Sequence, residues 1–254
     1  MDLGLSGKRA LVTGASRGIG RATAETLAQE GCSVAICARG QEGLDETAAK
    51  LESLGATVFH DAFDVADESA LTSFVDRAAE ALGGLDIVVS NVSAGTSRDI
   101  TQWERSLRGD LIPFVRLVET AVPHLERAGG GAIVAIGTTN AFDVVRPGGP
   151  TAYSALKAAV LQHAAAQARQ LAPRGIRVNT VSPGPIEFPG GDWDKIRQGR
   201  PEVYEEVLGR IPMGRYGKAE EIANAVAFLA SPRAGFSVGV NFVADGGLVS
   251  RVQS

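Results

Sequence analysis

The sequence predicts an α/β fold in which helices cover both faces of one doubly wound parallel sheet. Short apolar runs alternate with amphipathic helical patterns along the 254 residues. The stretch TGASRGIG, residues 13–20, joins the first apolar run to the first helical pattern. No internal repeat or low-complexity linker interrupts the alternation, so we expect the whole chain, 1–254, to form a single domain.

The first five elements have the βαβαβ order of a mononucleotide-binding half. After them, Asp67 is a good N-cap for a helix that ends near Leu82, and LDIVVS is typical of a strand buried on both faces. A long helix is expected over 103–128, with Pro123 as an irregularity. We expect strands at 10–12, 33–38, 56–63, 85–90, 132–136, 177–182 and 240–244, and the other helices at 21–30, 43–54, 151–171 and 219–230.

One segment, 183–217, departs from the alternation. It is rich in proline and glycine and has only one short helical candidate, at 202–209. An insertion of this length in a compact domain is usually functional, and it begins at the carboxyl end of a strand, where doubly wound sheets bind ligands. We therefore expect a lid over the site, the alternative being a surface excursion that packs against a neighbouring subunit.

Composition and charge narrow the function classes. A formal net charge of −4, a pI near 5.5 and the absence of a basic tract argue against nucleic acid as the main partner. Cys32 and Cys37 fit neither a disulfide framework nor a metal spacing, which favours buried thiols in a reducing compartment. No stretch is long and apolar enough to cross a bilayer, and no histidine has a carboxylate or cysteine at ligand spacing. We expect a cytoplasmic protein with a small-molecule ligand and no nucleic-acid, membrane or metal partner.

Three glycines of TGASRGIG lie between the first strand and the first helix. Gly14 allows a sharp turn, Gly18 a close approach to a ligand, and Gly20 close packing of the helix on the strand. Free N–H groups at a helix N-terminus attract phosphate, so the stretch is typical of a pyrophosphate cradle. Its spacing, Gly-x3-Gly-x-Gly, differs from the commoner G-x-G-x-x-G, so a merely tight glycine turn is the alternative.

A tyrosine and a lysine, Tyr153 and Lys157, share one face of the expected helix 151–171. The free tyrosine pKa is about 10, and a neighbouring ammonium together with a helix N-terminus favours phenolate. This pair can therefore exchange a proton near neutral pH. The alternative is a core tyrosine beside a lysine whose stem lies on apolar surface.

Six motifs in one order extend this pattern: TGASRGIG, Asp64-Val65, LDIVVSN ending at Asn91, YSALK at 153–157, IRVNTVSPGPI at 176–186 and ADGG at 244–247. Together they resemble the short-chain dehydrogenase/reductase family over essentially the whole chain. The resemblance implies a Rossmann-type sheet of seven parallel strands and hydride transfer between a nicotinamide and a carbonyl or secondary alcohol. It also implies a homotetramer, and the apolar tail Leu248-Val249 after the last strand is consistent with burial by a symmetry mate.

The resemblance also implies roles for individual residues. Tyr153 would be the acid/base, and Lys157 would lower its pKa and hold the nicotinamide ribose. Asp64 and Val65 would contact the adenine, and Asn91 would stabilise the strand end near the cofactor. The full expected cofactor-binding set is Gly14, Ser16, Arg17, Gly18, Ile19, Gly20, Arg39, Asp64, Val65, Asn91, Tyr153, Lys157, Pro183, Gly184 and Ile186.

Charge at the end of the second strand indicates which nicotinamide cofactor is used. A carboxylate there would bind a ribose 2′-hydroxyl and repel a 2′-phosphate, whereas arginine pairs with that phosphate. Here the strand ends in Cys37-Ala38-Arg39, without an acid, and Arg17 lies in the glycine turn. We therefore expect NADP(H), with NAD(H) possible.

Three positions depart from the family pattern. The substrate-binding serine is replaced by Thr138, which aligns best by its distance from the strand. Thr139 is the alternative, because the stretch from Thr138 to Tyr153 is longer than usual. Phe188 stands where a cofactor-contacting threonine often occurs. The fourth-helix asparagine is Asp110, which would stabilise the Lys157 ammonium and oppose phenolate, so that the enzyme would run best as a reductase.

Asp110 has an alternative to the position beside Lys157. Its side chain could instead point to solvent or pair with Arg105 or Arg108.

We expect an NADP(H)-dependent oxidoreductase acting on a ketone or secondary alcohol. A 3-oxoacyl-thioester (acyl-carrier-protein) reductase is the alternative among enzymes. A cofactor-binding sensor or scaffold with weakened catalysis is the alternative outside them, since Thr138 and Asp110 both depart from the pattern.

Overall fold

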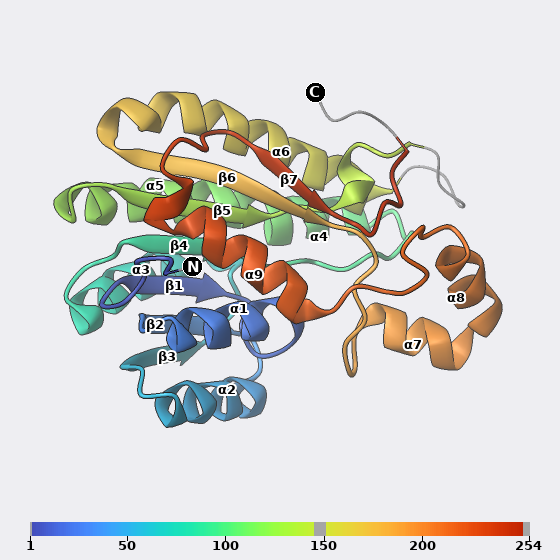
Figure 1. Cartoon of the computed structure of the whole chain (residues 1–254), viewed down its shortest axis with the longest axis horizontal. Coiled ribbons are helices and arrows are strands. Elements are labelled where there is room, and N and C mark those ends of the chain that lie inside the picture. The colour runs from blue at the N-terminus through green and yellow to red at the C-terminus, as the bar shows by residue number, and fades with distance from the viewer. Residues whose placement is uncertain (1, 145–150, 251–254) are drawn as a thin grey trace.

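A computed structural model describes residues 2–144 and 151–250 and contains a seven-stranded, fully parallel sheet (Figure 1). The strand order is β3-β2-β1-β4-β5-β6-β7, so the chain builds outward from β1 in one direction and then from β4 in the other. This is the doubly wound order, and it confirms the predicted fold class. The strands are β1 (Arg9–Thr13), β2 (Ser33–Ala38), β3 (Val58–Ala62), β4 (Ile87–Ser90), β5 (Gly131–Ile136), β6 (Ile176–Pro183) and β7 (Asn241–Ala244).

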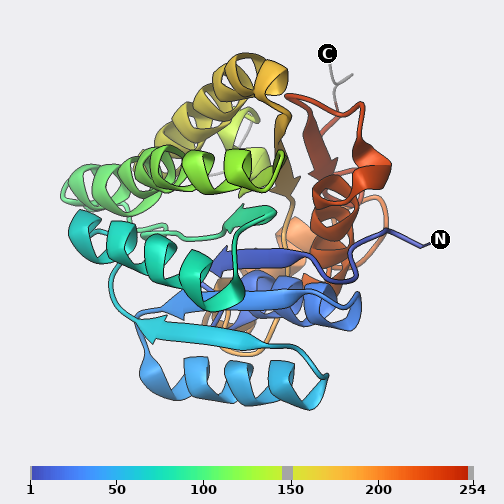
Figure 2. The ribbon, with the colours of Figure 1, turned by 90° about the vertical axis from the view of Figure 1, so that its left-hand side faces the viewer.

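Helices cover both faces of the sheet (Figure 2). Side chains alternate along β1, so Ala10 and Val12 face a core formed with α1, α2 and α9, while Leu11 faces a core formed with α3, α5 and α6. The helices are α1 (Gly18–Gln29), α2 (Gln41–Ser53), α3 (Glu68–Leu82), α4 (Gln102–Ser106), α5 (Ile112–Arg127), α6 (Ala152–Leu171), α7 (Asp192–Gly199), α8 (Pro201–Leu208) and α9 (Ala219–Ala230). Short turns are the π-helical η1 (Leu107–Leu111) and the 3₁₀ turns η2 (Thr139–Ala141), η3 (Ala172–Arg174) and η4 (Pro232–Ala234).

Two helix starts are fixed by side-chain caps. Asp67 caps α3 as predicted, and its Oδ1 accepts the N–H groups of Ser69 and Ala70 at 3.0 Å each. Thr151 caps α6, and its Oγ1 accepts the N–H of Ser154 at 3.2 Å. The second cap fixes where the helix that carries Tyr153 and Lys157 begins.

The helix predicted over 103–128 is divided into α4, the π turn η1 and α5. The irregularity predicted at Pro123 is wrong, because α5 continues through Pro123. The break lies one turn before Pro113, at the start of α5. Pro113 lacks the N–H that would bond to the carbonyl of Gly109, and its ring crowds that carbonyl, so the regular helix cannot pass through this point.

The segment 183–217 contains two helices, α7 and α8, where only one was predicted. The missed helix, α7, is short and mostly polar, but it begins with Asp192 and Asp194 in its first turn, which is a favourable charge for a helix start. Both helices lie outside the sheet, beyond the end of β6 (Figure 1).

Two further findings concern residues 2–144 and 151–250. No helix there is long and apolar enough to cross a bilayer. No group of three or more His, Cys, Asp or Glu side chains there could hold a metal ion, and both cysteines are free and buried.

Candidate active site

The glycine turn after β1 is shaped by contact with the end of β4. Gly14 has φ +66°, and a Cβ at this position would lie 2.3 Å from the carbonyl oxygen of Asn91. The Asn91 Nδ2 donates to the Gly14 carbonyl at 3.0 Å, and the Asn91 N–H donates to Thr13 Oγ1 at 3.0 Å. A Cβ at Gly20 would lie 2.2 Å from the Gly14 oxygen, so α1 packs directly on the turn. Only glycine fits at these two positions.

The N-terminus of α1 suits an anionic ligand. Helix α1 begins at Gly18, so Gly18 and Gly20 lie in its first turn rather than before it. The N-cap, Arg17, makes no side-chain capping bond, and no acidic residue lies in the first turn. Free N–H groups and the positive end of the helix dipole therefore meet the glycine turn, as a dinucleotide pyrophosphate requires. The residues present fit such a group.

Lys157 is buried in the second turn of α6, one helical turn after the half-buried Tyr153. Its Nζ donates to the carbonyl of Val92 at 2.9 Å and to that of Ile136 at 3.1 Å, and lies 3.5 Å from Asp110 Oδ1. Burial lowers the pKa of Lys157, and the Asp110 carboxylate acts in the opposite direction. Burial thus favours loss of the lysine proton, whereas the oxygen acceptors around Nζ favour its retention.

Consecutive residues join the two halves of the site. Asn91 holds the glycine turn, and the carbonyl of the next residue, Val92, holds Lys157. Both follow β4, at the edge where the order of the sheet reverses beside β1. Ligands of doubly wound sheets bind at such a switch point.

Of the environments considered for Asp110 from the sequence, the structure shows the one beside Lys157. Its side chain is fully buried and faces Lys157. The pairing with Arg105 or Arg108 is wrong, because Arg105 donates to Gln102 Oε1 at 2.6 Å and Arg108 lies 3.6 Å from Glu104.

Both threonines after β5 are buried. Thr138 Oγ1 accepts the N–H of Asn140 at 3.2 Å, which uses the hydroxyl oxygen and leaves its hydrogen to be donated. Thr139 begins η2 and is the more deeply buried of the two. Part of the stretch between Thr139 and Tyr153 lies outside the described residues.

The residues predicted for the adenosine half lie at the ends of β2 and β3. Arg39 follows β2 and is exposed, and none of the ion pairs within the described ranges involves it. Asp64 is exposed and accepts the N–H of Ala66 at 3.0 Å, and Val65 is buried. Ser16 is half-buried beside Gly43 at the start of α2, and Ile19 packs on the core.

A contact between the insertion and the glycine turn was missed by sequence reasoning. The Phe188 ring packs against Gly18, where a Cβ would lie 2.5 Å from the ring. Phe188 and Gly191 are joined by a turn hydrogen bond of 3.0 Å, and Arg17 Nη1 donates to the Gly190 carbonyl at 2.8 Å. The residues are some 170 positions apart, and no local pattern signals such a contact.

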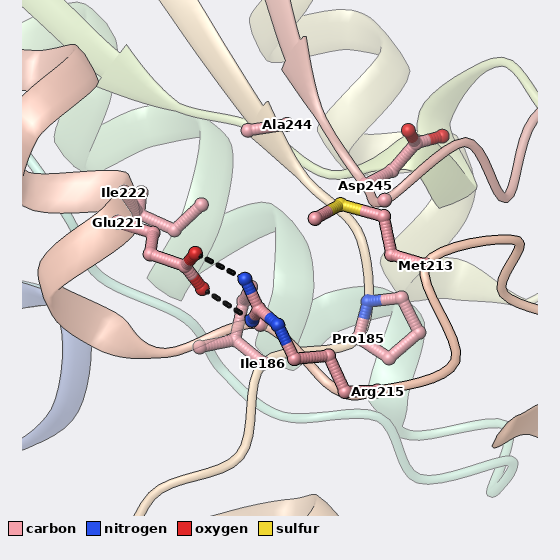
Figure 3. A pocket seen from close by; sticks show the side chains of 10 residues that line it. Pro185, Ile186, Met213, Arg215, Glu221, Ile222, Ala244 and Asp245 are labelled. Carbon is pink, nitrogen blue, oxygen red and sulfur yellow. Dashed lines mark hydrogen bonds and ion pairs between the residues drawn. The ribbon is translucent and has the colours of Figure 1, made fainter.

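The first residues of the segment 183–217 follow β6 and stay close to the end of the sheet. The Gly184 N–H donates to the carbonyl oxygen of Ala244 at 2.9 Å. Ile186 is buried and forms an isolated parallel β-bridge with Gly217. Pro185 and Ile186 also line a pocket of about 170 Å³, together with Met213, Arg215, Gly217, Glu221, Ile222, Ala244, Asp245 and Gly246 (Figure 3).

That pocket is distinct from the Tyr153–Lys157 face, since neither residue lines it. At its side, Arg215 makes two hydrogen bonds to Glu221, of 2.8 and 2.6 Å (Figure 3). The Arg215 guanidinium and the Lys218 N–H lower the pKa of Glu221 to about 2. Glu221 therefore stays charged and fixes the start of α9.

Known proteins are similar to this chain over most of its length. A family model described as Enoyl-(Acyl carrier protein) reductase matches residues 14–249. Isoepoxydon dehydrogenase of Penicillium expansum is 38% identical over 252 residues, which cover 98% of this chain and 97% of that protein. Cis-4-hydroxycyclohexanecarboxylate dehydrogenase of Sinomonas cyclohexanicum is 36% identical over 245 residues, covering 94% and 95%. A 3-oxoacyl-[acyl-carrier-protein] reductase of Thermotoga maritima is 34% identical over 253 residues, covering 96% and 99%.

Solved structures share the fold. L-sorbose reductase from Gluconobacter frateurii, complexed with NADPH and L-sorbose, has a TM-score of 0.90 at 32% identity and covers 99% of this chain and 100% of its own. A 7α-hydroxysteroid dehydrogenase complexed with NADH and 7-oxo glycochenodeoxycholic acid has a TM-score of 0.90 at 30% identity, covering 99% and 98%. A short chain dehydrogenase from Burkholderia cenocepacia J2315, in complex with NADP, has a TM-score of 0.88 at 35% identity, covering 96% and 99%.

Proposed function

The chain belongs to the short-chain dehydrogenase/reductase family and is an oxidoreductase of alcohols or ketones, and we propose that it uses NADP(H) on a ketone or secondary alcohol carried by a ring. The main support for this proposal is that two consecutive residues hold the two parts of the site together. Asn91 bonds to the glycine turn, and the carbonyl of Val92 accepts a hydrogen bond from Lys157 on α6. A phosphate cradle and a proton-exchanging pair thereby lie at one switch point of the sheet.

The side chains divide the chemistry between them. A nicotinamide dinucleotide supplies the hydride for reduction, or accepts it in oxidation, when it is bound. Tyr153 gives its phenolic proton to the carbonyl oxygen in reduction and takes the proton from the alcohol in oxidation. Thr138 donates a hydrogen bond to the same oxygen and orients it. Lys157 stabilises the phenolate by its charge.

Arg39 supports the choice of NADP(H). Its guanidinium is exposed at the end of β2, where the dinucleotide ribose of a doubly wound sheet lies, and no carboxylate of the described residues pairs with it. Two of the solved relatives are complexed with NADPH or NADP, and another with NADH. The arginine is therefore the feature of this chain that favours the phosphorylated cofactor.

Replacing Arg39 with alanine tests that choice. We expect NADP(H) binding to weaken by about 1.5–3 kcal/mol, the value of a charge-assisted hydrogen bond, with little change for NAD(H). Calorimetric titration of both cofactors measures the difference. Arg169→Ala, at an exposed position near the far end of α6, is the matched control. Equal losses for both cofactors in Arg39→Ala would show that Arg39 does not bind the 2′-phosphate.

The relatives support a ring-bearing substrate. Their names include a hydroxycyclohexanecarboxylate and a hydroxysteroid, each with a secondary alcohol on a carbocycle. The second candidate is a 3-oxoacyl-thioester reductase, favoured by relatives that are 34–35% identical. NADPH oxidation, followed by absorbance, should be fastest with cyclic ketones in a panel that also contains acetoacetyl thioesters and open-chain ketones. Preference for the thioester would support the second candidate.

The segment 183–217 is proposed as the lid of this site, within one domain that spans the chain. The support is its contact with the glycine turn through Phe188 and Gly190. We also propose a cytoplasmic location, since both cysteines are free and buried, as in a reducing compartment.

A further inference from the structure

Asp110 brings a fully buried carboxylate to the face of α6 that carries the proton-exchanging pair. Its Oδ1 lies 3.5 Å from Lys157 Nζ and 3.4 Å from the backbone nitrogen of Ala94, which donates to it. No donor within residues 2–144 and 151–250 bonds to its other oxygen, Oδ2, which is also buried. The contacts of the described residues therefore satisfy one carboxylate oxygen of Asp110 and leave the other without a donor. The negative charge of the carboxylate is only partly balanced and acts on the groups around it.

The π turn η1 gives Asp110 this position. Leu107 and Arg108, in the same turn, are exposed, whereas Asp110 is buried against α6. A π turn lies between two regular helices here, so the residue that faces inward is set by the turn rather than by helical periodicity. The carboxylate is thus built into the fold beside the lysine.

The three protons of a lysine ammonium have three acceptors here. They are the carbonyl oxygens of Val92 and Ile136 and the Asp110 carboxylate. A neutral amine has only two N–H groups and would direct its lone pair at the third oxygen, which is unfavourable. The geometry therefore favours a charged Lys157 opposite a charged Asp110.

We propose that Asp110 is a positioning residue that raises the pH at which the Tyr153–Lys157 pair loses each of its two protons. A negative charge stabilises the ammonium and opposes the phenolate, and each effect makes removal of a proton harder. Because the two groups titrate as a coupled pair, both steps move in the same direction when the same group loses its proton first with and without the carboxylate.

The other charged groups on the elements packed against α6 have partners of their own or lie elsewhere. Arg177 donates to the carbonyls at the end of α9, and Arg174 pairs with Glu126. Arg105 donates to Gln102, and Arg108 pairs with Glu104. The remaining groups are Asp143 after η2, and His163 and Arg169 on α6 itself, more than one turn beyond Lys157. Asp110 differs from these groups in its contact with Lys157, whose Nζ lies 3.5 Å from its Oδ1.

The proposal has a consequence for the direction of the reaction, and that consequence rests on the proposed function. Reduction of a ketone needs the protonated phenol, whereas oxidation of an alcohol needs the phenolate. With Asp110 present, Tyr153 stays protonated to higher pH than it would beside a neutral residue. Oxidation should therefore require more alkaline conditions, while reduction is retained near neutral pH.

A tyrosinate titration tests the electrostatic part without any turnover. The chain has three tyrosines, and the ultraviolet absorbance step that disappears in Tyr153→Phe belongs to Tyr153. Burial raises the pKa of both Tyr204 and Tyr216, so their steps lie above the ordinary tyrosine range. In Asp110→Asn we expect the Tyr153 step to move about one pH unit lower. Glu104→Gln, which removes an exposed carboxylate on α4, should leave it unchanged.

The second measurement is the rate of alcohol oxidation against pH with saturating NADP⁺. Both limbs of the profile should move to lower pH in Asp110→Asn and stay in place in Glu104→Gln. Asp110→Ser is measured alongside, and circular dichroism selects the neutral variant that keeps the native fold. Superimposable tyrosinate titrations, or a shift to higher pH, would overturn the proposal. A lower-pH titration step without turnover of any alcohol or ketone would support the role of Asp110 and overturn the proposed function instead.

Discussion

Tyr153 differs from the other two tyrosines in its surroundings. The Tyr204 hydroxyl donates to Glu187 at 2.9 Å, and the Tyr216 hydroxyl donates to the Tyr204 carbonyl at 2.9 Å, so both belong to the packing of the insertion. Tyr153 lies instead in the first turn of α6, with Lys157 one turn away. At the scale of single residues, this neighbourhood is the reason for proposing Tyr153, and neither of the other two tyrosines, as the proton carrier.

Tyr153→Phe should keep cofactor binding and lose about two to four powers of ten in turnover, the usual contribution of a positioned acid/base. The ring and its packing remain, so only the hydroxyl is removed. Steady-state rates and a cofactor titration on the same preparation measure the two effects. Tyr204→Phe is the matched control, because it also removes one phenolic hydroxyl. Wild-type turnover in Tyr153→Phe would assign the proton transfer to another group.

At the scale of elements, the turn at Phe188–Gly191 ties the insertion to the first turn of α1. The Phe188 ring lies against both Gly18 and Gly191, and Arg17 donates to Gly190. The same first turn of α1 is the expected pyrophosphate site. Movement of the insertion and access of the cofactor should therefore be linked.

Phe188→Ala should speed NADPH release roughly fivefold to tenfold. Partial burial of an aromatic ring stabilises the contact between the insertion and the first turn of α1 by about 1 kcal/mol, and the substitution removes that ring. Stopped-flow energy transfer from tryptophan to bound NADPH measures the rate, and Trp193 on α7 lies within the insertion. Phe59→Ala removes a half-buried ring on β3, stacked on Phe74, and is the control. An unchanged release rate in Phe188→Ala would mean that this contact does not restrain the cofactor.

Element patterns in the sequence predicted the sheet well and the connections less well. Most strands contain an apolar run bounded by turn residues, and Asp67 caps α3 by a local rule, so both could be predicted from neighbouring residues. The π turn η1 has no such local signal, and the helix α7 is short and mostly polar. At the site, the facing of Asp110 and Lys157 was one of the stated alternatives. The contact of Phe188 with Gly18 was not predicted, because tertiary structure alone brings them together.

At the scale of the whole molecule, two exposed apolar surfaces need an explanation. One follows the edge strand β7 and the chain that leads into it, and comprises Phe236, Val238, Val240 and Phe242. The other runs from just before α4 to the start of the π turn η1 and comprises Ile100, Trp103 and Leu107. Since β7 ends the sheet, its outer edge also has no neighbouring strand among the described residues. Such surfaces are typical of contacts between subunits.

We predict that these two surfaces assemble the chain into a homotetramer of two-fold symmetry, because two different self-complementary patches close four copies into one particle. Light scattering at micromolar concentration should give about 106 kDa, four times the chain mass of 26.4 kDa. Phe236→Asp with Phe242→Asp should halve that mass by placing charge in one interface, and Trp103→Asp with Leu107→Asp should halve it through the other. Met213→Asp, at an exposed apolar position of the insertion, should leave the mass unchanged. A wild-type particle of monomer mass would contradict the assembly, and would leave the apolar edge of β7 to be covered by another partner.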